Sequence, residues 1–90
     1  MANKMITTEL THSNGTSCVF TFTNMDGFIS ADVKATRAPR TLNVRLNGKD
    51  MIHVLDRMEE DVMCGDSYID EAVADLAFEM RHLLAFAQSV

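Results

Sequence analysis

Residues 41–58 read TLNVRLNGKDMIHVLDRM, and the spacing of their apolar residues changes at Gly48. Before Gly48 apolar and polar residues alternate, which is the period of a strand. After it apolar residues recur every three or four positions, as on one face of a helix. The apolar residues that follow are Met51, Val54, Leu55, Met58 and Val62. The change predicts a strand that ends at Asn47-Gly48 and a helix that Asp50 caps.

The part of the chain before Gly48 predicts four antiparallel strands within about residues 5–47. Apolar and polar residues alternate clearly in three segments and more weakly in an earlier one. The clear segments are 18–23, 29–35 and 42–47, and the weaker one is 6–10. Asn14-Gly15 and Asp26-Gly27 predict tight hairpin turns, because Gly, Asn and Asp tolerate the positive φ that such turns need. Pro39, the only proline, predicts a loop rather than a tight turn between the last two strands.

The part after Gly48 predicts two helices, over about residues 50–63 and 67–88. Gly65 ends the first helix, and Ser67 begins the second with Asp70 three residues further on, as in a capping box. Apolar residues in an a/d heptad pattern predict the buried seam of the second helix. They are Ile69, Val73, Leu76, Met80, Leu83 and Ala87. The expected fold is a single α+β domain over residues 1–90, with both helices packed on one face of a four-stranded antiparallel meander (ββββαα).

The composition is that of one small folded domain. A chain of 90 residues buries only about 60–65% of its unfolded surface, so its core is thin. Apolar residues make up 47% of the chain, which is too many for a disordered one. We find neither a signal peptide nor an apolar run that could span a membrane, and we expect a cytoplasmic protein. Cys18 and Cys64 are too few for a disulfide scaffold and are expected to be reduced and mostly buried.

The formal net charge of −5 is unevenly distributed. Residues 1–48 hold five basic and three acidic residues, whereas residues 49–90 hold three basic and ten acidic residues. Acidic side chains can simply keep an amphipathic pair of helices in solution. The alternative is an acidic face that contacts a basic surface, such as one that normally holds nucleic acid.

A second apolar side of the second helix predicts an intermolecular contact. At 100° per residue, Ala74, Phe78 and Ala85 fall opposite the heptad seam, where a large aromatic side chain has no place in the core. Aromatic anchors surrounded by charge are typical of protein interfaces. The predicted partner-binding residues are Phe78 as the anchor and Glu71, Asp75, Glu59, Glu60 and His82 around it. The alternatives are a single exposed phenylalanine without function, or one that the first helix covers.

No motif predicts an enzyme, a metal site or a cofactor. His12, His53 and His82 lack the spacings of zinc sites, and the glycines are isolated turn residues rather than phosphate-binding loops. Cys18 and Cys64 lack the local motif of a catalytic nucleophile. We therefore predict no catalytic residue, metal or cofactor. An enzyme or small-ligand binder that uses His53, His82 or Cys64 is kept as an alternative hypothesis.

A basic segment, residues 34–45, supports a further alternative, a nucleic-acid or small-ligand binder. Its basic residues are Lys34, Arg37, Arg40 and Arg45. Phenylalanines nearby in the sequence could stack on bases. However, the isoelectric point is about 4.9 and four basic residues release few counterions, so direct binding of nucleic acid is not expected.

The leading hypothesis is a small acidic protein that binds another protein and has no enzymatic activity. Its sharper form is a phage or mobile-element inhibitor of a host nucleic-acid-processing or defence complex in the host cytoplasm, by analogy of size, charge and compactness. The second hypothesis is a homo-oligomeric structural subunit. A homodimer fits either hypothesis, through the heptad seam or through the Phe78 side, and no membrane contact is expected.

Overall fold

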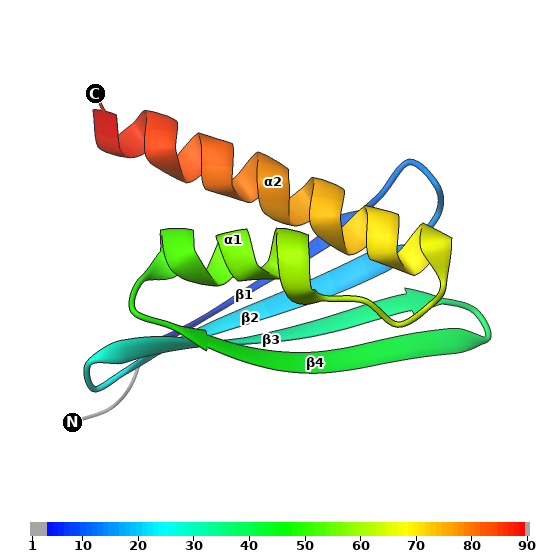
Figure 1. The fold of residues 1–90 in the computed structure, drawn as a ribbon, viewed down its shortest axis with the longest axis horizontal. Coiled ribbons are helices and arrows are strands. Elements are labelled where there is room, and N and C mark those ends of the chain that lie inside the picture. The colour runs from blue at the N-terminus through cyan, green and yellow to red at the C-terminus, as the bar shows by residue number, and fades with distance from the viewer. Residues whose placement is uncertain (1–3, 90) are drawn as a thin grey trace.

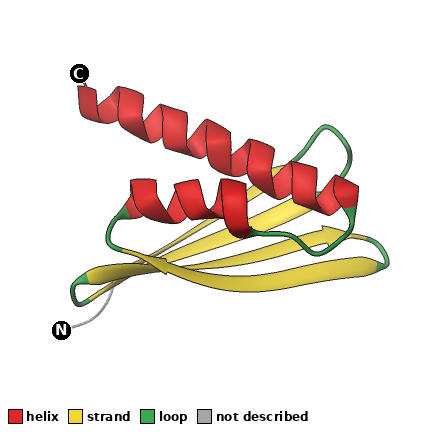
Figure 2. Cartoon of the chain, in the orientation of Figure 1, coloured by secondary structure: helices red, strands yellow, loops and turns green. Residues whose placement is uncertain are grey.

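The structure, a computed structural model, describes residues 4–89. Four strands form one antiparallel sheet in the order β1-β2-β3-β4, and two helices follow (Figure 1). The elements are β1 (Met5–Thr11), β2 (Ser17–Met25), β3 (Phe28–Arg37), β4 (Arg40–Gly48), α1 (Met51–Asp61) and α2 (Ser67–Ser89). Both helices lie on one side of the sheet, so the domain has two layers (Figure 2). The predicted ββββαα arrangement is confirmed.

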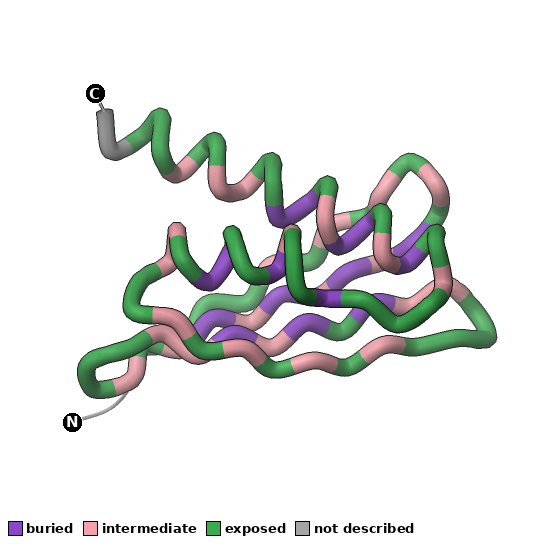
Figure 3. The backbone as a smooth tube through the Cα atoms, in the orientation of Figure 1, coloured by how far each residue is buried: buried purple, intermediate pink, exposed green. Residues whose placement is uncertain are grey.

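The core lies between the helices and the inner face of the sheet (Figure 3). Phe20, Val33 and Val44 lie side by side across β2, β3 and β4 on this face. Alternate residues are buried over 18–22 in β2 and 31–35 in β3, as are the apolar stripe of α1 and the first half of that of α2, which confirms the predicted periods there. The buried apolar residues are Cys18, Phe20, Phe22, Ala31, Val33, Ala35, Val54, Leu55, Met58, Val62, Ile69, Ala72, Val73, Leu76 and Ala77. β1 and β4 contribute only partly buried side chains.

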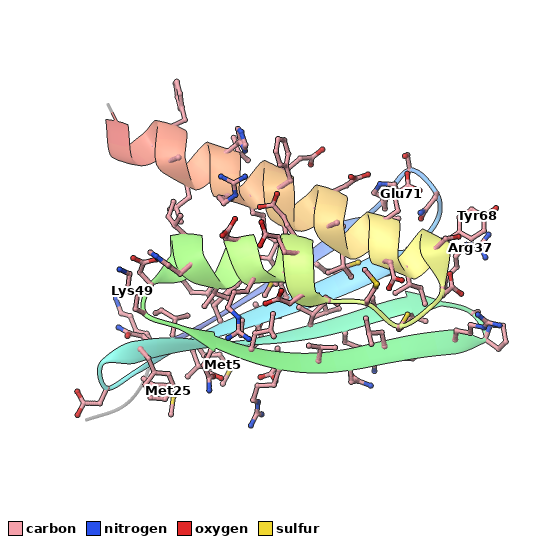
Figure 4. All side chains as sticks on the ribbon, viewed as in Figure 1. Met5, Met25, Arg37, Lys49, Tyr68 and Glu71 are labelled. Atoms are coloured by element: carbon pink, nitrogen blue, oxygen red, sulfur yellow. The ribbon has the colours of Figure 1, made fainter. Side chains whose placement is uncertain are left out.

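The outer face of the sheet, on the side away from the helices, is mostly polar. One row across it consists of Thr7, Thr21, Asp32 and Arg45. Arg45 Nε donates to Asp32 Oδ1 at 2.8 Å within this row. Met5 also lies on the outer face, and Figure 4 shows its side chain on the side of the sheet away from the helices.

Two hairpins use the glycines that the sequence singles out. Gly27 has a φ of 89° in a two-residue turn between β2 and β3. Gly15 has a φ of 92° and ends a three-residue loop that His12 and Thr16 close, with His12 N donating to Thr16 O at 2.8 Å. Both glycines occupy the left-handed region, where a side chain is disfavoured.

The connection between β3 and β4 differs from the prediction. Arg37 pairs with Arg40, so only Ala38 and Pro39 lie between the strands and the connection is a tight turn. The Ala38–Pro39 peptide bond is cis, and cis proline fits the third position of a four-residue turn. The predicted loop is wrong, because this proline lies within the tight turn instead of interrupting the two strands.

The caps of the two helices were predicted with unequal success. Asp50 caps α1 as predicted, and its Oδ1 accepts from the backbone N–H of His53 at 2.9 Å. The cap of α2 is Asp66 rather than Ser67, because Asp66 Oδ1 accepts from the backbone N–H of Tyr68 and of Ile69. The predicted start at Ser67 holds, but the capping side chain lies one residue earlier and carries a charge that favours the helix N-terminus.

The predicted seam of α2 is buried only in its first half. Ile69, Val73 and Leu76 are buried and Met80 is half-buried, but Leu83 is 70% exposed and Ala87 is exposed. In Figure 1, α2 continues past the first turn of α1 and diverges from the sheet toward its C-terminus. The heptad pattern therefore continues beyond the elements that cover it, which a periodicity cannot reveal.

Candidate protein-binding surface

Phe78 lies on the solvent side of α2 and is 47% exposed, as predicted from its place opposite the seam. Its ring lies 4.0 Å from the ring of His82, measured between centroids, and 5.6 Å from Arg81 Cζ. His82 and Arg81 follow Phe78 by four and three residues, so the helix itself brings the three side chains together. The aromatic ring is thus exposed on one side and supported on the other.

Four of the six predicted partner-binding residues form one stripe on α2. They are Glu71, Asp75, Phe78 and His82, spaced four, three and four residues apart. This spacing places side chains on the same side of a helix. We refer to these four residues as the Phe78 face. Figure 4 shows Glu71 near the first turns of α2.

The other two predicted residues lie on α1, and one of them has an internal role. Glu59 has a side chain only 16% exposed, and its Oε2 accepts from Arg81 Nε at 2.6 Å. The bond to Glu59, together with the nearby charges of Asp56 and Glu60, raises the pKa of Arg81. Glu59 therefore joins the two helices beneath the Phe78 face and supports it through Arg81, whereas Glu60 is exposed.

His12 fixes the other end of the Phe78 face. Its side chain is only 11% exposed, its Nε2 lies 2.8 Å from Asp75 Oδ2, and its Nδ1 accepts from the backbone N–H of Asn14 at 3.0 Å. The bond to Asp75 raises the pKa of His12. The contact ties the loop between β1 and β2 to α2, and no local pattern predicts it because the two residues are 63 positions apart.

His12, Glu71 and Asp75 also form a possible metal-ligand group among the described residues. The hydrogen bonds of His12 do not favour a metal there. Because Nδ1 accepts from an amide, the proton of the neutral ring is on Nε2, where it is donated to Asp75. A metal bound at Nε2 would replace that proton, and the neutral ring would then have to carry its proton on Nδ1. Nδ1 already accepts a hydrogen bond from the backbone N–H of Asn14.

Of the three residues proposed above for an enzyme or ligand binder, His53 and Cys64 lie at opposite ends of α1, and His82 lies against Phe78 on α2. His53 belongs to the cap of α1, with Nδ1 2.7 Å from Asp50 Oδ1. Cys64 is exposed in the loop before α2, which corrects the expectation that both thiols are mostly buried. Burial raises the pKa of the Cys18 thiol to about 11, so it carries little thiolate at neutral pH.

The predicted basic patch is divided between two places. Arg37 and Arg40 lie at the turn between β3 and β4, where Arg37 Cζ stacks 4.0 Å from the centroid of the Tyr68 ring (Figure 4). Arg40 Nη1 donates to Asp66 Oδ2 at 3.1 Å. Lys34 and Arg45 lie on the outer face of the sheet. Arg37, Arg40 and Arg45 thus already contact groups of this chain.

An apolar groove, which sequence reasoning missed, lies between β1, β2, α1 and the second half of α2. Its volume is about 350 Å³, and Ile6 and Leu83, which are 63% and 70% exposed, form part of it. The lining residues are Ile6, Thr8, Phe22, Met51, Leu55, Met80, Leu83 and Leu84. No local pattern in the sequence indicates the groove, because it forms only where four elements meet.

Comparison with known protein families, curated proteins and solved structures gives no match for this chain. Within residues 4–89, neither helix combines the length and the apolar character needed to cross a bilayer.

Proposed function

We propose that this protein is a non-enzymatic, cytoplasmic protein that binds another protein through the Phe78 face. The observation that carries the proposal is Phe78 itself, a half-exposed aromatic ring that contacts His82 and lies near Arg81. Interface anchors are commonly large aromatic residues held in place before binding, because little side-chain entropy is then lost.

The charge around Phe78 suggests the chemistry of the partner. Glu71 and Asp75 lie on the same face, and Glu60 is exposed on α1. The half of the chain that contains both helices holds ten acidic and three basic residues. Such a surface is attracted to a basic one, and basic protein surfaces commonly hold nucleic acid. We therefore propose a partner with a nucleic-acid-binding surface, which fits an inhibitor of a host nucleic-acid-processing or defence complex.

The test is affinity capture from a lysate of the cells in which the protein occurs, followed by displacement with heparin. We expect wild-type protein to retain one complex that heparin releases. Phe78→Glu should weaken the binding by about 30-fold or more, as expected for an interface anchor worth about 2 kcal/mol. Phe28→Glu is the matched control, because Phe28 is also a partly exposed aromatic residue but lies on β3.

Two results would contradict the proposal. One is a captured complex that Phe78→Glu and Phe28→Glu retain equally. The other is a complex that heparin and salt do not release, because an acidic surface bound to a basic one must be sensitive to both.

A further inference from the structure

We propose that two copies of this chain pair through their β1 strands, antiparallel and centred on Thr8, so that their sheets join. The proposal concerns a surface other than the Phe78 face and does not depend on the proposed function. β1 is an edge of the sheet, since the strand order is β1-β2-β3-β4. A strand at an edge offers unpaired backbone groups to another strand.

The hydrogen bonds at the two ends of β1 determine which backbone groups face outward. Asn24 N donates to Lys4 O and His12 N donates to Thr16 O, both within the register of β1 and β2. Hydrogen-bonded pairs alternate along an antiparallel ladder, so the even-numbered residues of β1 bond to β2. The odd-numbered residues, Met5, Thr7, Glu9 and Thr11, therefore direct their N–H and C=O groups away from the sheet.

A two-fold axis at Thr8 uses all of these groups. It places Thr7 opposite the second copy's Glu9 and Met5 opposite the second copy's Thr11, each as a hydrogen-bonded pair. Thr8 then faces Thr8 of the second copy in a non-hydrogen-bonded pair. This is the register that pairs all seven residues of β1, and it keeps the helices of both copies on one side of the sheet.

The side chains on the inner face fit the same register. Ile6, which is 63% exposed at the apolar groove, comes opposite the second copy's Leu10. Lys4 comes opposite the second copy's His12, whose ring is already paired with Asp75. The only charged residue within β1 is Glu9, which lies opposite the second copy's Thr7 rather than opposite the second copy's Glu9. The apolar contact of Ile6 and the position of Glu9 therefore agree with the backbone pattern.

The other edge of the sheet does not offer the same match. β4 carries Arg40 and Arg45, and charged side chains on an edge strand oppose pairing with another edge. β1 also lies beside the apolar groove, which β4 does not. These differences favour a dimer through β1 over an open chain of sheets.

Cysteine cross-linking tests the register directly. In a Cys64→Ser background, which removes the exposed native thiol, Thr8→Cys should form a disulfide-linked dimer under mild oxidation. The Cα atoms of a non-hydrogen-bonded pair are about 4.5 Å apart, within the range of a disulfide. Thr7→Cys is the matched control and should stay unlinked, because the two copies of Thr7 are not opposite each other in this register.

Sedimentation of the protein without added cysteines completes the test. We expect a monomer–dimer equilibrium whose dissociation constant rises at least tenfold with Ile6→Glu and little with Met5→Glu. The two residues are similarly exposed, at 63% and 66%, but lie on opposite faces of β1. A wild-type protein that is monomeric at all concentrations would overturn the proposal. A dimer that Thr8→Cys does not link, or that Phe78→Glu dissociates, would also overturn it.

Discussion

Arg81 of α2 donates from Nε to Glu59 Oε2 of α1 at 2.6 Å, and the same guanidinium lies 5.6 Å from the Phe78 ring. One side chain thus connects the contact between the helices with the exposed aromatic residue. Arg81 is only 28% exposed, so its position is set by the fold rather than by solvent. The orientation of Phe78 therefore depends on a residue of the other helix.

Glu59→Gln should lower the melting temperature and weaken partner binding. The change keeps an oxygen that can accept from Arg81 but removes the charge that makes the hydrogen bond strong. Glu60→Gln is the control, because Glu60 also lies on α1 but is exposed. Thermal denaturation of both variants checks the prediction, and equal melting temperatures would show that the Glu59–Arg81 bond does not stabilise the helix pair.

Gly48→Ala should reduce the free energy of unfolding by about 1–3 kcal/mol, the usual cost of overfilling a packed site. A Cβ on Gly48 would lie 2.7 Å from Val54 Cγ2 and 3.0 Å from Val54 N. Asn47→Ala, one residue earlier at an exposed position, is the control and should change little. Urea denaturation measures both, and an unchanged Gly48→Ala variant would mean that α1 can move away from β4.

Thr16→Val should leave the protein equally stable or make it more stable by about 1 kcal/mol. Thr16 is fully buried, and its hydroxyl has no hydrogen-bond partner in the part of the chain that the structure describes. Replacing the hydroxyl with a methyl group of similar size removes the cost of its desolvation. Urea denaturation is again the measurement, and a marked loss of stability would show that the hydroxyl has a partner, such as an internal water.

Stability at acid pH should depend on Asp66. Its pKa lies below the ordinary 3.8, because the backbone N–H groups of Ile69 and Tyr68 and the charge of Arg40 favour the carboxylate. A group whose pKa is lowered by folding stabilises the protein above its unfolded-state pKa, and this stabilisation is lost as the pH falls through the folded-state pKa. Asp66→Asn should therefore reduce the fall in melting temperature below pH 3.8.

A matched substitution separates the cap of α2 from its first residue. Ser67→Ala should change the melting temperature little at any pH, because the capping side chain is Asp66. If Ser67→Ala destabilises the protein as much as Asp66→Ala does, the assignment of the cap is wrong.

The periods of the sequence were sufficient to predict the fold. Apolar residues recur at every second position over β2 to β4 and at every third or fourth position over α1. Such patterns arise when a strand or helix buries one side, so they identify both the element and its buried side. The errors occurred where tertiary contacts decide. The turn at the cis Pro39 is tight where a loop was expected, and Leu83 and Ala87 are exposed although the heptad pattern of α2 includes them.

The candidate site was only partly predictable. The exposure of Phe78 follows from helix geometry, so it could be predicted from residues 69–87 alone. The contacts of Glu59 with Arg81 and of His12 with Asp75 join residues 22 and 63 positions apart, and no local pattern connects them. The groove at Ile6 was missed for the same reason, because four elements form it.

The exposure of Leu83 and Ala87 near the end of α2 has a consequence for amide hydrogen exchange. A helix segment without tertiary packing opens locally at little cost, whereas amides under a buried stripe exchange only when the domain unfolds. We expect amides after Leu83 to exchange rapidly and those between Ile69 and Ala77 to be strongly protected. A second copy or a partner that covers this end would slow amide exchange in the last turns of α2. The exchange rate of these amides therefore reports whether this part of the surface is covered.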